Sequence, residues 1–369
     1  MRDLLAILFF FLIASTPLLA YDAEIDGIYY NFSGDEAEVT YKKTNGDYNI
    51  PSSDYSGIVE IPVSVFYEGK NFNVTSIGAY AFYGCDALTS IVIPESVTFI
   101  GAQSFAGCRG LTHIAIPLGV KSIEDKSFYE CTNLETVIIP EGVKIIGGQC
   151  FYNCSSMSAV NLPSTVADIK EWAFEGCGSL ASFTIPEGVS VICDGIFYRC
   201  SSLKSVTIPQ SVTYIGIGAF ADCSSLSAIE LPNGVTAISE DAFQNCSNLT
   251  NVIFPESLNY IDSNAFRNCI ALNSMICKSQ NPSRCGVGAF NGVDKEKCLV
   301  KVPQGSKEAY SNADEWKDFN IIEMETSIFS PLGKTEEATT IYDLGGRKMV
   351  NGKLPKGLYI VNGKVMVGK

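Results

Sequence analysis

Hydrophobic residues recur along this chain with a period of 23 residues. One cysteine stands at the same place in nine successive units, and a phenylalanine precedes each cysteine by three residues. The nine cysteines are Cys85, Cys108, Cys131, Cys154, Cys177, Cys200, Cys223, Cys246 and Cys269. The unit reads AFxxCxxLxxIxIPxxVxxIGxx. Such a strict spacing indicates a repeated structural unit whose apolar positions are covered by neighbouring coils of a stack.

Each unit contains two extended segments. In LTSIVIP, from Leu88 to Pro94, inward Leu and Ile alternate with outward residues, which predicts a short strand that the proline ends. In VTFIG, Val97 and Ile100 point inward and predict a second strand. The AF segment then turns back with room only for a short helical turn. The pattern therefore predicts a slim, weakly curved solenoid with short parallel strands on two faces and tight turns between them.

The segments on either side of the repeats have other patterns. An irregular lead-in is expected to cap the first coil, and Tyr310, Trp316 and Phe319 are expected to close the core after the last one. Ser306 can cap a short helix there. Near the end of the chain, Asn362 and Gly363 stand between YIV and VMV and predict a hairpin in a small antiparallel β unit. The expected divisions are an N-terminal β capping region at 21–75, the repeats at 76–303, a C-terminal cap at 304–325, a linker at 326–340 and a β-hairpin tail at 341–369.

Residues 1–20 have the pattern of a secretory signal peptide. Arg2 precedes a long apolar run, and the small residue Ala20 stands before the polar segment that follows. The alternative is a membrane anchor, since the run approaches the ~18 apolar residues that begin to suggest a span. We expect cleavage, export and no membrane insertion of the mature chain.

The net charge limits which partners the chain can bind, and the positions of the cysteines indicate whether disulfides stabilise it. The net charge of −14 opposes nucleic acids and anionic membrane surfaces, which clustered Lys and Arg would bind. Fourteen cysteines in an exported chain first suggest disulfides. The repeat register instead places nearly all of them at compact inward positions, which predicts buried free thiols with Cys298 alone outside the core.

The sequence contains little that indicates catalysis or metal binding. His113 is the only histidine and stands at an outward strand position without an evident partner. Clustered Cys and His ligands, the calcium-binding repeat and nucleotide-binding motifs do not occur, so we expect no metal and no cofactor. The rival to a non-enzymatic protein is a secreted hydrolase of surface glycans. It would need acidic residues converging in a cleft, whereas Glu135, Asp168 and Glu230 belong to different coils.

Two surfaces are candidate binding sites. Tyrosines follow the buried phenylalanine in four units and should share one edge of the solenoid; they are Tyr83, Tyr129, Tyr152 and Tyr198. Tyrosine is enriched at interface hot spots, although these rings could also only shield the turn. The outward places of the first strand are mostly small and include Thr89, Thr112 and Thr184. A flat face of this kind suits another protein or a glycan surface better than a small substrate.

The repeat and the cap that follows it resemble a known family. The unit AFxxCxxLxxIxIPxxVxxIG, together with VPxGSxEAYxxADxWxxF, is similar to BspA-type leucine-rich repeat proteins over residues 58–323. The resemblance implies a leucine-rich repeat solenoid and a surface-associated, adhesin-like protein without catalytic activity. Its partner would be a protein, such as a host extracellular matrix protein, or another bacterial cell. The ending, from YDLGGR to KGLYIVNGK, resembles the C-terminal sorting domain of Bacteroidetes-type bacteria.

Overall fold

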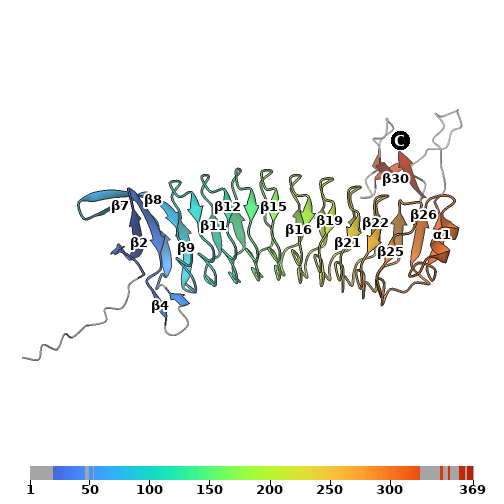
Figure 1. Cartoon of the computed structure of the whole chain (residues 1–369), viewed down its shortest axis with the longest axis horizontal. Coiled ribbons are helices and arrows are strands. Elements are labelled where there is room, and N and C mark those ends of the chain that lie inside the picture. Colours follow the sequence, from blue (N-terminus) through green and yellow to red (C-terminus); the bar gives the residue numbers. More distant parts are fainter. Residues whose placement is uncertain are drawn as a thin grey trace, which may run out of the picture.

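The stacked coils form one long, nearly straight solenoid, shown in Figure 1. The computed structural model describes residues 20–45, 50–52 and 54–324, and in the tail the strands at 341–343, 348–349, 357–361 and 364–368. The predicted linker and all but the last residue of the predicted signal peptide lie outside these ranges. The solenoid of parallel strands predicted from the 23-residue period is confirmed.

The first strands of successive coils lie along one side of the solenoid. Most contain three or four residues and pair in parallel with a register of 23 residues, as His113 does with Thr136. They are β6 (Gly57–Glu60), β9 (Leu88–Val92), β11 (His113–Ala115), β13 (Thr136–Ile138), β16 (Ser182–Thr184), β18 (Ser205–Thr207), β20 (Ala228–Glu230), β22 (Asn251–Phe254), β24 (Ser274–Cys277), β26 (Leu299–Val302) and β27 (Asn320–Glu323). The strand expected between Met157 and Pro163 does not form. Only an isolated bridge joins Asn161 to Ile138 there, in keeping with the poor strand propensity of asparagine.

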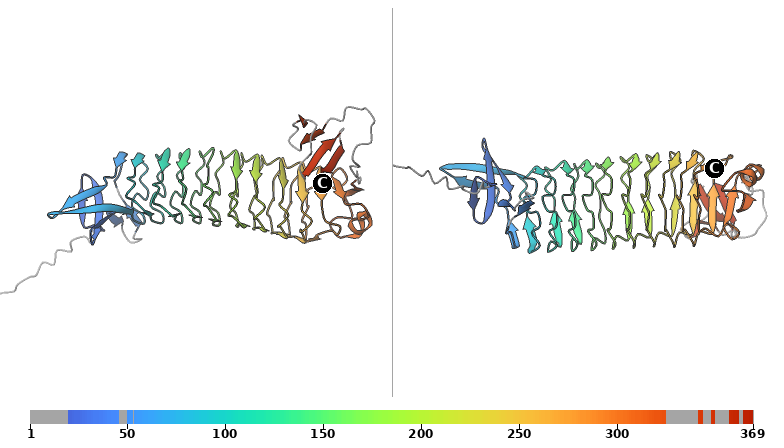
Figure 2. Two further views of the ribbon diagram at one scale, coloured as in Figure 1. Left: turned by 90° about the horizontal axis from the view of Figure 1, so that it is seen from above. Right: turned by 60° about the horizontal axis from the view of Figure 1, so that its bottom comes forward.

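The second strands lie along the opposite side and contain two residues each (Figure 2). Each places one side chain inward and one outward, as Tyr214 and Ile215 do. They are β10 (Phe99–Ile100), β12 (Ser122–Ile123), β14 (Ile145–Ile146), β15 (Asp168–Ile169), β17 (Val191–Ile192), β19 (Tyr214–Ile215), β21 (Ala237–Ile238), β23 (Tyr260–Ile261) and β25 (Arg284–Cys285). The expected helical turn after them is a run of hydrogen-bonded turns and not a helix, with bonds such as that from the Tyr83 amide to the Tyr80 carbonyl, 3.0 Å.

A ladder of phenylalanine rings fills the centre of the stack. Consecutive rings lie with centroids 5.0–5.9 Å apart and planes within 20° of one another. The ladder consists of Phe82, Phe105, Phe128, Phe151, Phe174, Phe197, Phe220, Phe243, Phe266 and Phe290, all fully buried. Each ring therefore contacts the coil before it and the coil after it, which is why a single coil could not hold its own core.

The repeated cysteines form a second ladder beside the rings. From Cys108 to Cys269 each thiol lies 3.0–3.2 Å from the carbonyl oxygen of the phenylalanine in the preceding coil, and we read these contacts as S–H donation. Cysteine is thus more than an apolar filler. None of the fourteen cysteines, all within the described ranges, forms a disulfide, and twelve of them are buried.

Three cysteines differ from the expected placement. Cys193 and Cys285 are only partly buried; Cys193 follows the inward Ile192 and therefore belongs to an outward place. The expectation that Cys298 lies outside the core is wrong, because its side chain is fully buried. A turn closed by the bond from the Cys298 amide to the Asp294 carbonyl, 2.9 Å, brings this thiol inward.

At the N-terminal end, a mixed sheet joins the stack through one long strand. It contains β1 (Ala23–Ile25), β2 (Ile28–Ser33), β3 (Glu36–Thr40), β7 (Ser64–Tyr67) and β8 (Lys70–Ile77), and a separate pair is formed by β4 (Lys43–Asn45) and β5 (Ile50–Ser52). In the mixed sheet β3 and β8 pair in parallel, and the other pairs among these strands are antiparallel. β8 pairs in parallel with β10 and so continues the second strands. Tyr55 lies against Phe82 with ring centroids 4.6 Å apart and covers the first ring of the ladder.

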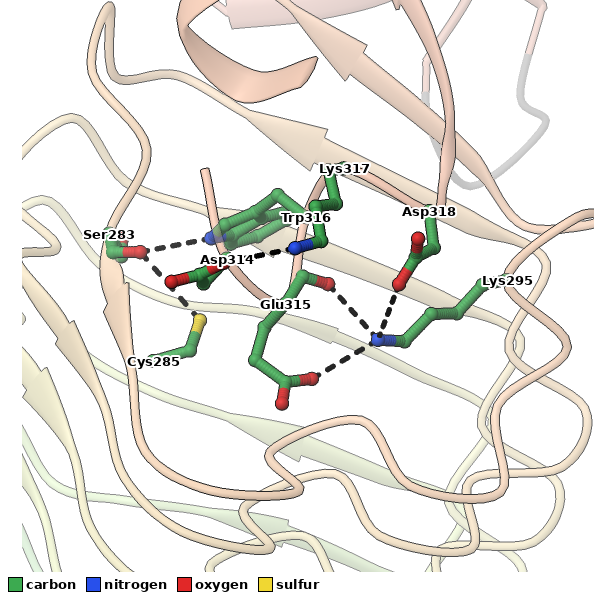
Figure 3. Close-up of polar contacts among 8 residues, drawn as sticks. All are labelled: Ser283, Cys285, Lys295, Asp314, Glu315, Trp316, Lys317 and Asp318. Carbon is green, nitrogen blue, oxygen red and sulfur yellow. Dashed lines mark hydrogen bonds and ion pairs between the residues drawn. The ribbon is translucent and has the colours of Figure 1, made fainter. Parts of the chain in front are cut away.

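At the other end, the segment around α1 (Lys307–Asn312) covers the last ring of the ladder. The Trp316 ring lies 5.2 Å from that of Phe290 between centroids, and its Nε1 donates to the Ser283 carbonyl oxygen, 2.9 Å (Figure 3). Ser306 stands at the N-cap position, but its hydroxyl donates to Gln280 and does not cap the helix. The Glu323 carboxylate accepts the Gly305 and Lys307 amides instead.

The described strands of the tail form the predicted antiparallel unit. The sheet order is β29–β28–β30–β31, with β28 (Ile341–Asp343), β29 (Lys348–Met349), β30 (Gly357–Val361) and β31 (Lys364–Gly368). β30 and β31 pair with Val361 opposite Lys364, as a two-residue hairpin requires. The sheet lies beside the last coils of the solenoid (Figures 1 and 2).

Candidate binding edge

The tyrosine edge is defined by Tyr83, Tyr129, Tyr152 and Tyr198, which occupy one place in the turn after the second strand. Each directly follows a buried phenylalanine of the ladder, and because that side chain points inward, the tyrosine after it lies at the surface. All four are half-buried. Because five coil steps separate the first from the last and ladder rings are 5.0–5.9 Å apart, the row extends slightly beyond the ~24 Å that ideal strand spacing gives.

The four tyrosines do not form one continuous stack. Tyr129 and Tyr152 stack with nearly parallel planes, with centroids 4.6 Å apart and 6° between the planes. Tyr83 instead meets Tyr80 edge to face at 5.9 Å, and Tyr198 meets Trp172 at 6.0 Å and 86°. The edge therefore consists of three aromatic pairs, a geometry that aromatic quadrupoles favour.

Tyr80 and Trp172 were not predicted as part of this edge from the sequence. Both stand two residues before a ladder phenylalanine, and this register place was the available signal. Backbone geometry directs them: every residue at that place from Tyr80 to Gly288 has a left-handed conformation, with φ of 59° at Trp172. Outside glycine this conformation is uncommon, so the turn, and not local preference, sets where these side chains lie.

Cations already contact two rings of the tyrosine edge. The Arg199 guanidinium lies 4.8 Å from the Tyr198 centroid, and the Lys126 ammonium lies 5.9 Å from that of Tyr129. These distances are typical of cation–π contacts. Partial burial raises the pKa of Tyr129, and the neighbouring Glu130 adds to that effect.

A carboxylate interrupts the row between Tyr152 and Tyr198. Glu175 occupies the tyrosine place in its coil and is only 8% exposed. No residue in the described ranges donates a hydrogen bond to its carboxylate or forms an ion pair with it. Burial raises the pKa of Glu175, and the charge of Arg199 offsets part of this increase.

The strand-face residues Thr89, Thr112 and Thr184 are exposed but are not brought together. Thr89 and Thr112 hold the same place in adjacent coils, whereas Thr184 belongs to another column three coils further on. Thr89 donates to the Gly57 carbonyl oxygen, 2.9 Å, and Thr112 lies 3.1 Å from Nδ1 of the exposed His113. These three threonines therefore do not converge on one site.

A hollow lies on the second-strand side, near the C-terminal cap. Its volume is about 780 Å³, and its lining includes Glu256, Tyr260, Gln280, Asn281 and Arg284. The coil that lines it has one extra residue, since Arg284 pairs with Tyr260 at a spacing of 24. The hollow contains one carboxylate, whereas glycoside hydrolysis uses two.

The acidic residues considered for a hydrolase are placed elsewhere. Asp168 pairs with Lys170 at 2.5 Å and Glu230 with Lys278 at 3.0 Å, each on the solenoid surface. The described residues also contain no group of three metal-ligating side chains. Within the same ranges, no helix is long and apolar enough to cross a bilayer.

Comparisons with known proteins identify the repeats. The family profile described as BspA type leucine-rich repeat region (6 copies) matches residues 75–204 and 190–314. No curated protein matches the chain. A leucine-rich repeat protein from T. pallidum has 30% sequence identity, with 56% of this chain and 90% of that chain covered and a TM-score of 0.48.

Two further solved structures cover more of the chain at lower identity. A leucine-rich repeat protein from Bacteroides ovatus is 24% identical, with 83% of this chain and 100% of that chain covered and a TM-score of 0.47. A leucine rich cell surface protein from Faecalibacterium prausnitzii is 22% identical, with coverages of 84% and 95% and a TM-score of 0.42. The family is therefore assigned from the profile match, which extends over well more than half of the chain.

Proposed function

The chain belongs to the BspA-type leucine-rich repeat family, and on this premise we propose that it is an exported, adhesin-like protein without catalytic activity. It recognises a protein or another cell through the surface of its solenoid. Proteins of this family are surface proteins typically involved in binding, and adhesion is the finer role proposed here. Host extracellular matrix proteins and neighbouring bacterial cells are the partners to test first.

The tyrosine edge is the observation that carries this proposal. Its rings are large, amphipathic and half-buried, so their positions are fixed before a partner arrives. Tyrosine and tryptophan provide contact area at a low cost in side-chain entropy. A row of more than ~20 Å along one edge suits a protein surface and is too long for a small ligand.

Two terminal segments bear on the export that the proposal requires. The first twenty residues have the composition of a signal peptide, and the antiparallel tail is proposed as the sorting domain that directs the chain to the surface. The glycan hydrolase is not advanced as a second candidate, because the hollow near the C-terminal cap contains a single carboxylate.

The test is a binding assay with the chain lacking residues 1–20, immobilised and exposed to matrix proteins and to bacterial cells. Changing Tyr83, Tyr129, Tyr152 and Tyr198 together to Ser should weaken binding of the retained partner at least about tenfold, roughly 1.4 kcal/mol. The far-UV circular dichroism and the melting temperature should stay near those of the unmodified chain.

A matched control removes tyrosines from another face. Tyr214 and Tyr260 are exposed on the second-strand side, and changing both to Ser should leave binding within about twofold. If no protein or cell is retained, the proposed function fails. If the four-tyrosine variant binds fully, the tyrosine edge is not the site, and the strand face around Thr89, Thr112 and Thr184 is tested next.

A further inference from the structure

Glu175 is the one acidic residue at the tyrosine place of the coil. The same place contains Tyr152 in the preceding coil and Tyr198 in the next. The main chain of Glu175 is fully bonded: its amide donates to the Trp172 carbonyl, 3.1 Å, and its carbonyl accepts the Asn153 amide, 2.7 Å. Only the carboxylate is left without a hydrogen bond or an ion pair in the described structure.

The Glu175 side chain is largely buried, with 8% of the residue exposed. Its carboxylate oxygens still reach solvent, because the fully buried side-chain oxygens without a partner in the described structure are those of Tyr30 and Ser104. Removing an ionised carboxylate partly from water without a hydrogen bond or an ion pair is unfavourable. A carboxylate that lacks such a partner within the chain and is open to solvent can accept a cation from outside.

The side chains around Glu175 have the chemistry that a cation needs. The Trp172 ring lies over Gly195, where a Cβ atom would stand only 1.9 Å from it, so glycine in the next coil makes room for this ring. Other coils place Gln103, Lys126 or Gln149 in the equivalent position. Trp172 and Tyr198 meet at 86°, while Glu175 follows Trp172 by three residues and holds the place of Tyr198 in the preceding coil. Two aromatic rings near a negative charge are typical of sites for organic cations.

The contact of Arg199 with Tyr198 and the net charge of the chain both favour a cationic ligand. The guanidinium of Arg199 already rests on Tyr198 at 4.8 Å, which shows that this ring face accepts a cation, yet Arg199 forms no ion pair with Glu175 in the described structure. The net charge of the chain is −14, and this field favours approach of a basic partner.

We propose that Glu175, Trp172, Tyr152 and Tyr198 form a receptor for one basic side chain, a lysine ammonium or an arginine guanidinium, presented by the protein partner. The inference rests on the proposed function, because it names the chemistry that the tyrosine edge recognises. The carboxylate binds the cation, and the rings of Trp172 and Tyr198 cover its sides.

Tryptophan fluorescence reports directly on this site. The chain has two tryptophans; Trp316 is buried in the C-terminal cap, whereas Trp172 is half-exposed beside Glu175. Titration of the chain lacking residues 1–20 with tetra-arginine or tetra-lysine should produce a saturable change in emission. A tetra-citrulline peptide, which is similar in shape to tetra-arginine but uncharged, should produce none. Trp172→Phe should abolish the signal.

Substitutions in the same coil distinguish binding by the Glu175 carboxylate from attraction by the overall negative charge. Glu175→Gln should weaken tetra-arginine binding at least tenfold while the melting temperature stays equal or rises, since an unpaired buried charge is removed. Glu171→Gln removes the same charge from an exposed place in the same coil and should change binding less than twofold. Arg199→Gln should strengthen binding, because it removes a competing cation.

The inference is overturned if no saturable change occurs, or if Glu171→Gln and Glu175→Gln weaken binding equally. It is also overturned if Glu175→Gln and Arg199→Gln both lower the melting temperature, since the two residues would then be an internal pair. These results leave the proposed function intact as long as the four-tyrosine variant still loses its partner. Loss of the proposed function is recognised separately, when no protein or cell is retained at all.

Discussion

Ser104 and Ser127 provide a test in which one substitution has opposite effects in two adjacent coils. Both stand just before a ladder phenylalanine, and both are fully buried. The Ser127 hydroxyl donates to the Glu124 carbonyl oxygen, 2.8 Å. The Ser104 hydroxyl has no hydrogen-bond partner. Alanine occupies this place in several other coils, for example at Ala173, so it fits the backbone without strain.

The expected changes in unfolding free energy follow from whether the serine hydroxyl has a hydrogen-bond partner. A buried donor without a partner costs about 1–3 kcal/mol, and a typical intramolecular hydrogen bond contributes about 0.5–1.5 kcal/mol. Ser104→Ala should therefore raise the free energy of unfolding by ~1–2 kcal/mol, because it removes only a penalty. Ser127→Ala should lower it by ~1 kcal/mol. The same oxygen atom is deleted from both coils, so changes in volume and in side-chain entropy cancel in the comparison.

The assay is urea unfolding of the chain lacking residues 1–20, followed by far-UV circular dichroism under one set of conditions. A repeat array can unfold in stages, so the midpoint and the slope of the transition are both compared among the three proteins. The expected order of midpoints is Ser104→Ala, then the unmodified chain, then Ser127→Ala. Equal destabilisation by both substitutions would refute the reasoning, since it would mean that the Ser104 hydroxyl has a partner.

Four further predictions test other parts of the structure. Phe174→Ala removes a ring stacked between two coils and should cost about 3–5 kcal/mol of unfolding free energy; near-native stability would mean that the register is wrong. Because burial raises the pKa of Cys131 and Cys177 to about 12, a thiol reagent at pH 8 should label few cysteines in the native protein and most after denaturation without reductant, and recovery of mainly disulfides would contradict this. Burial raises the pKa of Glu175 above its usual value of 4.5. Both states are protonated well below pH 4.5, whereas above the native pKa both are ionised and the native state bears the cost of burial, so stability should fall as pH rises between these limits; in Glu175→Gln this part of the pH dependence should disappear. Deletion of residues 330–369 should leave the solenoid folded but abolish surface display, and unchanged display would show that the tail is not an export signal.

The core of this fold was predictable because its period is a physical constraint. A side chain that stacks on its equivalents must recur at a fixed spacing, so the Phe82 to Phe266 column and the burial of Cys85 to Cys269 followed from counting residues. The contact of each cysteine with a carbonyl oxygen of the preceding coil did not follow. That contact depends on how closely the backbone of the preceding coil approaches the sulfur atom, and the spacing of residues in the sequence does not specify this distance.

Predictions failed where a side chain departs from its column. The missing strand at Asn161 and the buried Cys298 both occur where local residues differ from the repeat. Trp172 was overlooked because its place has no fixed residue type: glutamine, lysine and glycine occupy it in other coils. The left-handed backbone at that place is imposed by the stack and is visible only in three dimensions.

The same logic indicates where recognition should evolve in a solenoid. Inward columns contact two neighbouring coils at once, so a change such as Phe174→Ala weakens two interfaces and stability opposes it. Outward places contact little, and their residues can change with small effects on folding. Glu175 is the informative exception, because it stands at an outward place yet is buried and unpaired. Glu175 lowers folding stability and does not support the stack, so we infer that it is kept because a partner supplies the missing positive charge. Functional sites commonly lose folding stability in this way.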